Sequence, residues 1–500
     1  MDTRAAIPVR YQQIRSLIYY RNIYNSDRIV ILLALSGAIV LATSLPSLKL
    51  SVALVMGAIL LVAVLLRPAI GLYSLAVSAP FGSGIEVSVG PFLVSVTDAL
   101  VGLTVLAWIG YLSILRSARI HFPPLILPII LLLCALLLSL SNAISVSLGL
   151  KEIIKWLEVA AVLLMSSNIL NSTNTRLGLI ITMLMAAAVE AALGLVQSRF
   201  GLGPAGFLLG NDVLRAYGSF GQPNPYAGYL VASAAFGIGL AVGAMGIPKW
   251  KHWLIGAAAI SLPVTITLAG AAASLSRGAA LAFVAASGVC SLRDYRTIAA
   301  VLIVTLSALT LMYSGIAIPL PELLASRLDI TLEYFRLFDA RTVQVTPENW
   351  PVVHRMALWQ SAWYMFLSSP ISGVGAGNFD AAYPYFALPD WISFPLGHAH
   401  NYYLNLLAET GILGLISYTV LVLSIFIYCL RALFSYKDKS DLGIKGLWTS
   451  PPAIAWGVMA SITALSVHNI FDNLYVHGIP IFVALLMGLL SSVMMGRSHS

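Results

Sequence analysis

Charged residues are scarce in this chain of 500 residues. Asp, Glu, Lys and Arg together make up 10% of it, whereas hydrophobic residues make up 59% and the mean hydropathy is +0.90. A soluble protein carries about 25% charged residues, which it needs to cover its water-facing surface. The shortage therefore excludes a soluble enzyme, a disordered chain and a collagen-like chain, and it predicts a protein whose solvent is lipid.

Cysteine is also rare. Cys134, Cys290 and Cys429 each lie within or at the end of an apolar stretch, so they cannot staple an external loop, and no spacing fits a zinc site. The sequence contains no internal repeat and no low-complexity tract. These absences exclude a disulfide scaffold, a zinc module and a repeat array.

The formal net charge of +8 does not come from one basic patch. The basic residues stand in small groups at the ends of apolar runs, where a membrane protein uses cations to fix its orientation. This distribution argues against a nucleic-acid partner and favours the lipid bilayer as the partner of most of the surface.

Long apolar runs are what the sequence has in abundance. A bilayer core of about 30 Å needs about 20 helical residues, and dividing the chain at charge clusters and Pro or Gly groups gives fourteen candidate spans. They cover about 28–46, 49–66, 68–81, 93–115, 123–141, 150–170, 176–198, 225–246, 253–273, 278–292, 296–315, 401–431, 452–468 and 473–495. The third and tenth are short enough to be re-entrant, so we expect an all-α polytopic membrane protein with 12–14 transmembrane helices.

The positions of the basic residues predict the orientation. With the N-terminus inside, eighteen Lys and Arg fall in inner segments and ten in outer segments, and every short inner loop is basic. The predicted organisation is a cytoplasmic arm without a cleavable signal, two blocks of helices separated by an outer loop, a large extracytoplasmic loop and the final helices. These parts cover 1–27, 28–198, 199–224, 225–315, 316–400 and 401–495.

The large loop has helical patterns of its own. Apolar residues recur near helical spacing from Pro321 to Phe338, and aromatic residues alternate with polar ones from Pro347 to Leu367. A glycine-rich turn follows at 373–379. We therefore expect a helical cap that lies on the membrane, with aromatic side chains suited to the interface or to sugar faces.

Two outer arginines stand beside glycine and small residues. Arg277 lies in Ser276-Arg277-Gly278 at a span boundary, and Arg215 lies in the outer loop shortly before Asn224. The planar guanidinium matches phosphate oxygens, so the pair could clamp a diphosphate. The alternatives are an interface arginine at 277 and a solubilising arginine at 215.

Two histidines precede the twelfth span. Neutral His398 or His400 could accept a proton from a hydroxyl. A metal site is the alternative, but the only nearby carboxylate, Glu409, lies on the opposite helix face from His400, so a metal would need remote ligands. We therefore predict no metal.

Several carboxylates invite structural interpretations. Glu409 is expected about 13 Å below the end of its span, either in a helix–helix hydrogen bond or in a substrate site. The i, i+3 spacing of Lys155 and Glu158 predicts an ion pair. His468 and Asp472 bracket the last outer turn and indicate a local polar cluster rather than catalytic residues.

Together these motifs resemble the O-antigen ligase and O-antigen polymerase superfamily of lipid-linked glycan transferases. The resemblance runs in order through about 210–420, with the 469–473 turn also in keeping. It is carried by Arg215 with Gly218, Pro223 and Asn224; Ser276-Arg277-Gly278; Trp359 with Pro370 and Gly373-Val-Gly375; and His400-Asn401 with Leu404, Glu409, Gly411 and Gly414.

The resemblance implies an inverting, metal-independent and cofactor-free glycosyltransferase of the GT-C type in the bacterial cytoplasmic (inner) membrane. Its donor would be a glycan on polyprenyl (undecaprenyl) diphosphate and its acceptor a lipid, glycan or protein hydroxyl, as in lipopolysaccharide or exopolysaccharide biosynthesis. It implies diphosphate binding by Arg215 and Arg277 and acceptor activation by His400 on the periplasmic face. The residues expected to support the site or the acceptor are Arg355, His398, Glu409, Asn401 and Asn224.

A multi-span secondary transporter of a small anion or sugar is the alternative function. Such a protein would need broken helices whose polar groups meet at the middle of the membrane, ideally in inverted repeats. The sequence shows no such repeat, and its polar candidates gather at the outer face.

Overall fold

The computed structural model describes residues 47–495, apart from 83, 90–91, 115–119, 210–212, 246–249, 295, 314–337, 347–348, 389–396 and 437–442. The expected arm at 1–27, the first expected span at 28–46 and the expected helix from Pro321, up to the residue before Phe338, lie outside the described residues.

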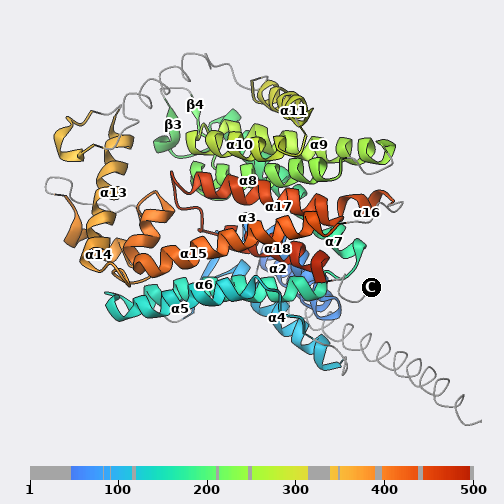
Figure 1. Ribbon diagram of the computed structural model, residues 1–500, viewed down its shortest axis with the longest axis horizontal. Helices are drawn as coiled ribbons and strands as arrows, with labels where there is room; N and C mark the ends of the chain where they lie inside the picture. Colours follow the sequence, from blue (N-terminus) through green and yellow to red (C-terminus); the bar gives the residue numbers. More distant parts are fainter. Residues whose placement is uncertain are drawn as a thin grey trace, which may run out of the picture.

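The described chain is a bundle of long helices with a smaller helical part at one end (Figure 1). The bundle helices are α2 (Leu48–Leu66), α3 (Pro68–Phe81), α4 (Val96–Ile114), α5 (Ile126–Ser139), α6 (Val146–Ile169), α7 (Thr173–Phe200), α8 (Pro223–Gly243), α9 (Trp250–Ala273), α10 (Arg277–Ser291), α11 (Arg296–Tyr313), α15 (Tyr402–Phe434), α17 (Pro451–His468) and α18 (Ile479–Met495). Each coincides with one of the expected spans.

The smaller part contains α13 (Trp350–Ser368) and α14 (Phe379–Phe386), and the short helix α16 (Ile444–Trp448) lies at the opposite end of the bundle (Figure 1). We call the end that carries α13 and α14 the cap end. The second helix expected in the large loop is confirmed as α13, and the glycine-rich turn lies between α13 and α14.

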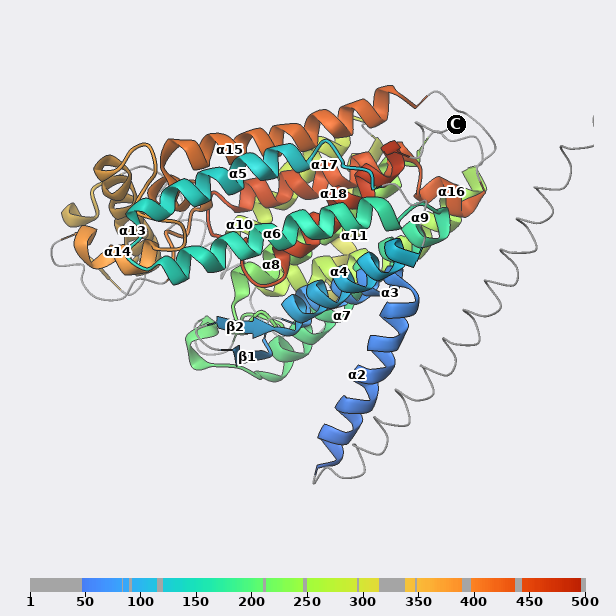
Figure 2. The same ribbon diagram turned by 90° about the horizontal axis from the view of Figure 1, so that it is seen from below.

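Two antiparallel hairpins interrupt the otherwise helical chain. One pairs β1 (Glu86–Val89) with β2 (Phe92–Ser95), in register Val87 to Val94, and the other pairs β3 (Leu208–Leu209) with β4 (Val213–Leu214) (Figure 2). Both are short connections between helices, and their strands satisfy backbone groups by pairing with each other.

Six helices of the described residues are long and apolar enough to cross a membrane, and five shorter apolar helices accompany them. The six segments are Val96–Ser113, Thr173–Phe200, Pro223–Gly243, Leu254–Ala273, Tyr402–Phe434 and Lys445–His468. The protein is therefore an all-α polytopic membrane protein apart from its hairpins. The two spans expected to be short are α3 with 14 residues and α10 with 15.

Small residues let the central helices approach closely. A Cβ atom added at Gly239 or Gly243 of α8 would overlap the backbone of Trp456 or Pro452 in α17. Helices in lipid gain little from the hydrophobic effect between them, so close backbone packing supplies much of their association. These contacts hold the first turns of α17 against α8.

Helix α15 changes direction near its cap end. Gly411 has φ 63° and ψ −162°, which is outside the helical region and suits only glycine. At this kink the N–H of Ile412 donates to the carbonyl of Pro370 (2.9 Å), while the carbonyls of Ala408 and Glu409 accept from the N–H groups of Val374 and Gly375 (both 2.9 Å). The turn after α13 thus completes the backbone hydrogen bonding of α15.

Candidate active site

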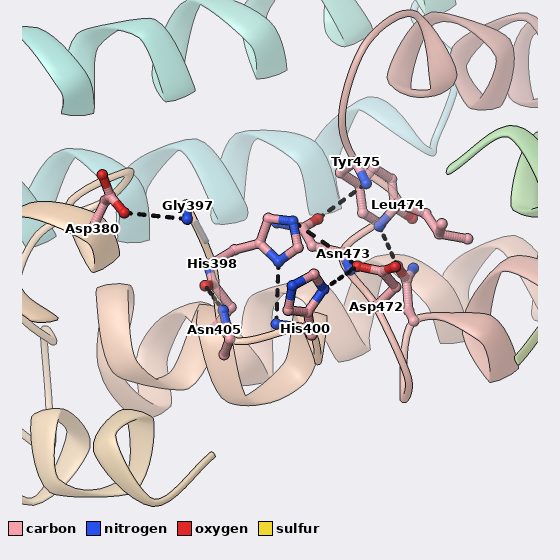
Figure 3. Close-up of polar contacts among 11 residues, drawn as sticks. Asp380, Gly397, His398, His400, Asn405, Asp472, Asn473, Leu474 and Tyr475 are labelled. Atoms are coloured by element: carbon pink, nitrogen blue, oxygen red, sulfur yellow. Dashed lines mark hydrogen bonds and ion pairs between the residues drawn. The ribbon is translucent and has the colours of Figure 1, made fainter. Parts of the chain in front are cut away.

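Two short segments that are distant in sequence meet at the cap end. The segment 397–401 leads into α15, and the turn 469–475 joins α17 to α18 (Figure 3). The backbone N–H of Tyr402 donates to the carbonyls of Asn469 (2.8 Å) and Asp472 (3.1 Å). This backbone contact fixes the position of each histidine relative to the turn.

His400 is paired with Asp472. Their Nδ1 and Oδ1 atoms are 2.9 Å apart, and the Asp472 side chain is only 3% exposed (Figure 3). His400 has φ 50°, a conformation that non-glycine residues adopt rarely and that is common at functional sites. With Asp472 ionised, Nδ1 of His400 carries the ring hydrogen and Nε2 is the atom that can accept a proton.

Asp472 is held in its charged form. Burial by itself raises the pKa of this carboxyl, but the hydrogen bond from His400 and the charges of His400, His398 and Arg355 outweigh that effect, so its pKa lies below the usual range. The N–H of Asn473 also donates to Oδ1 (2.9 Å). A carboxylate that stays ionised can orient an imidazole and stabilise the imidazolium formed when it takes a proton.

His398 lies against His400, with ring centroids 4.4 Å apart. Its Nδ1 accepts the backbone N–H of His400 (3.1 Å), and its Nε2 is 3.9 Å from Oδ1 of Asp472 (Figure 3). Burial, with the charge of His400, lowers the pKa of His398 to about 4, so this ring is neutral at physiological pH. Its hydrogen therefore sits on Nε2.

The two histidines do have a carboxylate nearby with which they could form a metal site. The ligand atoms of His398, His400 and Asp472 all lie within 4.8 Å of one another, so Asp472 is the remote carboxylate that a cation site would need. The hydrogen bond at Nδ1 of His398 keeps its ring hydrogen on Nε2, however, and an Nε2–H cannot coordinate a metal. Asp472 is also not merely part of a local polar cluster, because its partner comes from another helix.

Helix α13 brings positive charge to this cluster. The charge of Arg355 acts on Asp472 and on His398, and it also acts on His354 next to it. His354 stacks on Trp350, with ring centroids 5.0 Å apart, and burial, His400 and Arg355 together lower its pKa. Sequence reasoning missed His354, although its position beside Arg355 was a usable signal.

Arg215 is held at the end of α9. Its Nε donates to the carbonyl of Ser274 (2.8 Å), and its Nη2 donates to Oδ1 of Asn224 (3.1 Å), the second residue of α8. The neighbouring N–H of Ala216 donates to the carbonyl of Ala273 (3.0 Å). Asn224 therefore orients this arginine, whose guanidinium is half-buried.

Arg277 is the first residue of α10 and follows the N-cap Ser276, whose Oγ accepts from Ala279 N–H (3.4 Å). A Cβ on the adjacent Gly278 would meet His468 at 2.8 Å and Phe471 at 3.2 Å. The start of α10 thus packs on the end of α17, directly before Asp472. This contact brings Arg277 and, through Ser274, Arg215 to the same end as the histidines.

The loop that carries Arg215 is secured by α7. Glu190 is fully buried and accepts from the N–H (2.7 Å) and the hydroxyl (2.8 Å) of Ser219, while Gln197 accepts from Gly218 N–H (2.7 Å) and donates to its carbonyl (3.0 Å). Gly218 has φ 57°, and a Cβ there would overlap Glu190. Glu190 therefore holds this loop against α7.

Glu409 and Asn401 hold the framework in place. The two carboxylate oxygens of Glu409 accept the N–H groups of Gly377 and Phe379, each at 3.0 Å, so this side chain ties α15 to the glycine-rich turn and the start of α14. Asn401 caps α15 by accepting from Leu404 N–H (3.1 Å). Both residues position the cap and the histidine segment relative to α15.

Comparisons with known proteins agree with this arrangement. Residues 262–419 match the family described as O-antigen ligase. The teichuronic acid biosynthesis protein TuaE of Bacillus subtilis (strain 168) is 30% identical over 171 residues, which are 33% of this chain and 33% of that protein. The match thus spans about a third of the length of this curated relative.

The matched region contains the four residues Arg277, Arg355, His400 and Glu409, on which much of the resemblance rested. Residues 262–419 are therefore similar to the O-antigen ligase family, and the resemblance to the O-antigen ligase and polymerase superfamily expected from the sequence is confirmed over this part of the chain.

Proposed function

We propose that this protein is a glycosyltransferase of the bacterial cytoplasmic (inner) membrane that moves a glycan from a polyprenyl diphosphate to an acceptor hydroxyl. The single observation that carries the proposal is the His400–Asp472 pair (2.9 Å) at the arginine-bearing cap end, with His400 in the region that matches the O-antigen ligase family. The proposed membrane orientation puts the cap end on the periplasmic side, in line with the distribution of basic residues along the sequence.

His400 is the proposed general base. Its Nε2 takes the proton of the acceptor hydroxyl while the hydroxyl oxygen bonds to the anomeric carbon. Asp472 holds Nδ1–H and stabilises the positive ring that results. The bond between the anomeric carbon and the phosphate oxygen breaks in the same step, and the electron pair leaves with the polyprenyl diphosphate, so the configuration inverts.

Arg215 and Arg277 are the proposed diphosphate-binding residues. Negative charge builds on the leaving diphosphate as the glycosidic bond breaks, and fixed guanidinium groups stabilise it without having to reorganise. Asn224 on one side and Ser274 on the other hold Arg215 in place. Arg355 adds positive potential beside the histidines.

The acceptor is proposed only as a hydroxyl-bearing glycan, lipid or protein. TuaE is named for teichuronic acid biosynthesis, which favours the growth of an envelope polysaccharide over other outcomes. Ligation of the glycan to a lipid core is the alternative outcome. Polysaccharide growth and ligation would use the same donor and the same general base, and they differ only in the acceptor.

The test is purified full-length protein, a polyprenyl-diphosphate glycan and candidate acceptors, with released carrier and extended product both measured. We expect transfer by the wild type and a loss of about 100-fold or more in Arg215→Ala, Arg277→Ala and His400→Ala, at unchanged protein yield. Full activity in all three variants would refute the proposal, and substrate flux into proteoliposomes without any transfer would establish the transporter alternative instead.

A further inference from the structure

A cavity of about 550 Å³ lies at the end of the bundle opposite the cap. It is lined by residues at the junction of α2 and α3 and by residues near the ends of α4, α6, α7 and α18. This volume is typical of a small-molecule site. None of the site residues described above lines it, so it is separate from the proposed transfer reaction.

The wall of the cavity is basic. Arg67 and Arg176 both line it, His121 lies beside them, and none of the lining residues within the described chain is acidic. The side chain of Arg67 is exposed and makes no hydrogen bond or ion pair with any other residue that the structure describes. A cation in this position has its charge available for a ligand.

Arg176 is oriented by bonds on one side only. Its Nε donates to the carbonyl of Leu170 (2.9 Å) and to Oγ of Ser492 (3.2 Å), and its Nη2 donates to the carbonyl of Ser492 (3.0 Å). Within the described residues Nη1 has no protein acceptor, so its two hydrogens remain for an anion. The guanidinium is thus already positioned before a ligand arrives.

Backbone groups add to the positive potential. Helix α3 begins at Pro68 and α7 begins at Thr173, and first-turn residues of both helices line the cavity. Helix N-termini favour negative charge. The opposite wall is fixed by Asn168, which accepts from His121 N–H (2.9 Å) and donates to the His121 carbonyl (2.9 Å).

Part of the cavity wall is apolar. Leu66, Trp108, Leu112 and Ile169 supply hydrocarbon beside the basic groups. An anion with an attached acyl chain matches both halves of such a wall, whereas a free anion would use only the basic half. Basic pockets between helices at a membrane surface bind lipid head groups in this way.

We propose that this cavity binds the phosphate of an anionic phospholipid in the leaflet opposite the cap. Arg67 and Nη1 of Arg176 contact the phosphate oxygens, and the first carbons of the acyl chains lie on the apolar wall. The bound lipid joins α2 and α3 to α7 and α18, and it therefore stabilises the fold.

The test uses the full-length protein in neutral detergent, titrated with phosphatidylglycerol, phosphatidylcholine or inorganic phosphate, with the midpoint of thermal unfolding as the readout. We expect phosphatidylglycerol alone to raise the midpoint. Arg67→Gln should require about fivefold more phosphatidylglycerol for the same rise, as expected for one basic contact. Arg431→Gln, an exposed arginine near the same end of α15, is the matched control and should behave like the wild type.

Arg176→Gln should also weaken the binding of phosphatidylglycerol. Because the bonds of Arg176 to Ser492 affect the unfolding midpoint even without lipid, the comparison uses the phosphatidylglycerol concentration needed for half of the rise. An equal weakening in Arg67→Gln and Arg431→Gln would overturn the proposal in favour of a general surface charge effect. An equal rise with inorganic phosphate would overturn it in favour of a soluble anion. Neither result depends on transfer activity.

Discussion

Two buried carboxylates at the cap end of the molecule have opposite surroundings. Asp472 accepts from the ring of His400 and from one backbone N–H, whereas both oxygens of Glu409 accept backbone N–H groups. Backbone donors cannot change their protonation state, but an imidazole can. Under the proposed mechanism, the acid with a titratable partner takes part in the transfer, whereas the acid held by backbone donors is structural.

The sharpest way to test this comparison is Asp472→Asn. An amide at this position is neutral, so it cannot stabilise the imidazolium that forms when His400 takes the acceptor proton. We expect transfer to fall by about 10²–10⁴-fold with little change in the unfolding midpoint. The rate of glycan transfer by purified protein is the measurement.

The matched control is Asp380→Asn, because Asp380 is an exposed acid that accepts from Gly397 N–H (3.2 Å) beside the same histidine segment (Figure 3). It should keep near wild-type transfer. Wild-type rates in Asp472→Asn would contradict the assigned pairing with His400.

Glu409→Gln tests the other half of the comparison. The side-chain NH2 group of the glutamine would face the N–H of Gly377 or of Phe379, and that buried N–H would then lack an acceptor. We expect a loss of up to about 3 kcal/mol of stability, with transfer per folded molecule close to that of the wild type. Thermal unfolding in detergent measures the first quantity, and a rate normalised to folded protein measures the second.

Glu86→Gln, in the exposed hairpin strand β1, is the control for the change of residue type and should leave the midpoint unchanged. A Glu409→Gln protein with an intact midpoint and no transfer would place Glu409 in the chemistry and break the comparison.

The smallest expected effect concerns His398, whose pKa of about 4 lies below its value of about 6.5 in an unfolded chain. Below pH 6.5 the unfolded state binds more protons at this residue than the folded state, so its contribution to stability is complete above pH 6.5 and declines toward pH 4. We expect the folded protein to be about 2 kcal/mol less stable at pH 5 than at pH 7 on this account.

His398→Gln should lose this part of the pH dependence, because the amide oxygen can still accept from His400 N–H and does not titrate. Replacing the exposed His121 in the same way should leave the slope as it is. The measurement is the unfolding midpoint as a function of pH between pH 5 and 7. If His398→Gln has the same pH dependence as the wild type, the lowered pKa of His398 is contradicted.

Most helix positions could be predicted from the lengths of the apolar runs and from the Pro, Gly and charged residues that end them. Every described bundle helix matches an expected span, and α13 falls where the alternation of aromatic and polar residues placed it. The arrival of Arg215, Arg277 and His400 at one end also followed, since each stands at a span boundary of the same polarity. The positions of helices and of their ends depend on neighbouring residues in the sequence, so the periodicity and length of apolar runs are enough to predict them.

Side-chain pairs between helices that are distant in sequence could not be predicted from the sequence in the same way. Asp472 is 72 residues from His400, and only the packing of α15 against α17 makes them neighbours. The expected pair of Lys155 with Glu158 is wrong for a related reason. Glu152 stands at the same spacing and binds Lys155 (2.6 Å), whose Nζ also donates to the carbonyl of Tyr475 in the distant turn after α17 (3.0 Å).

The kink at Gly411 has a consequence for the order in which this protein is assembled. A regular helix satisfies its backbone within one segment before it meets any neighbour, but α15 depends on Pro370 to accept the N–H of Ile412 and on Val374 and Gly375 to donate to its carbonyls. Backbone groups left unpaired in hydrocarbon cost several kcal/mol each. The turn at 370–375 must therefore be in place before the backbone of α15 is fully hydrogen-bonded at its kink, so this helix depends on the segment before it.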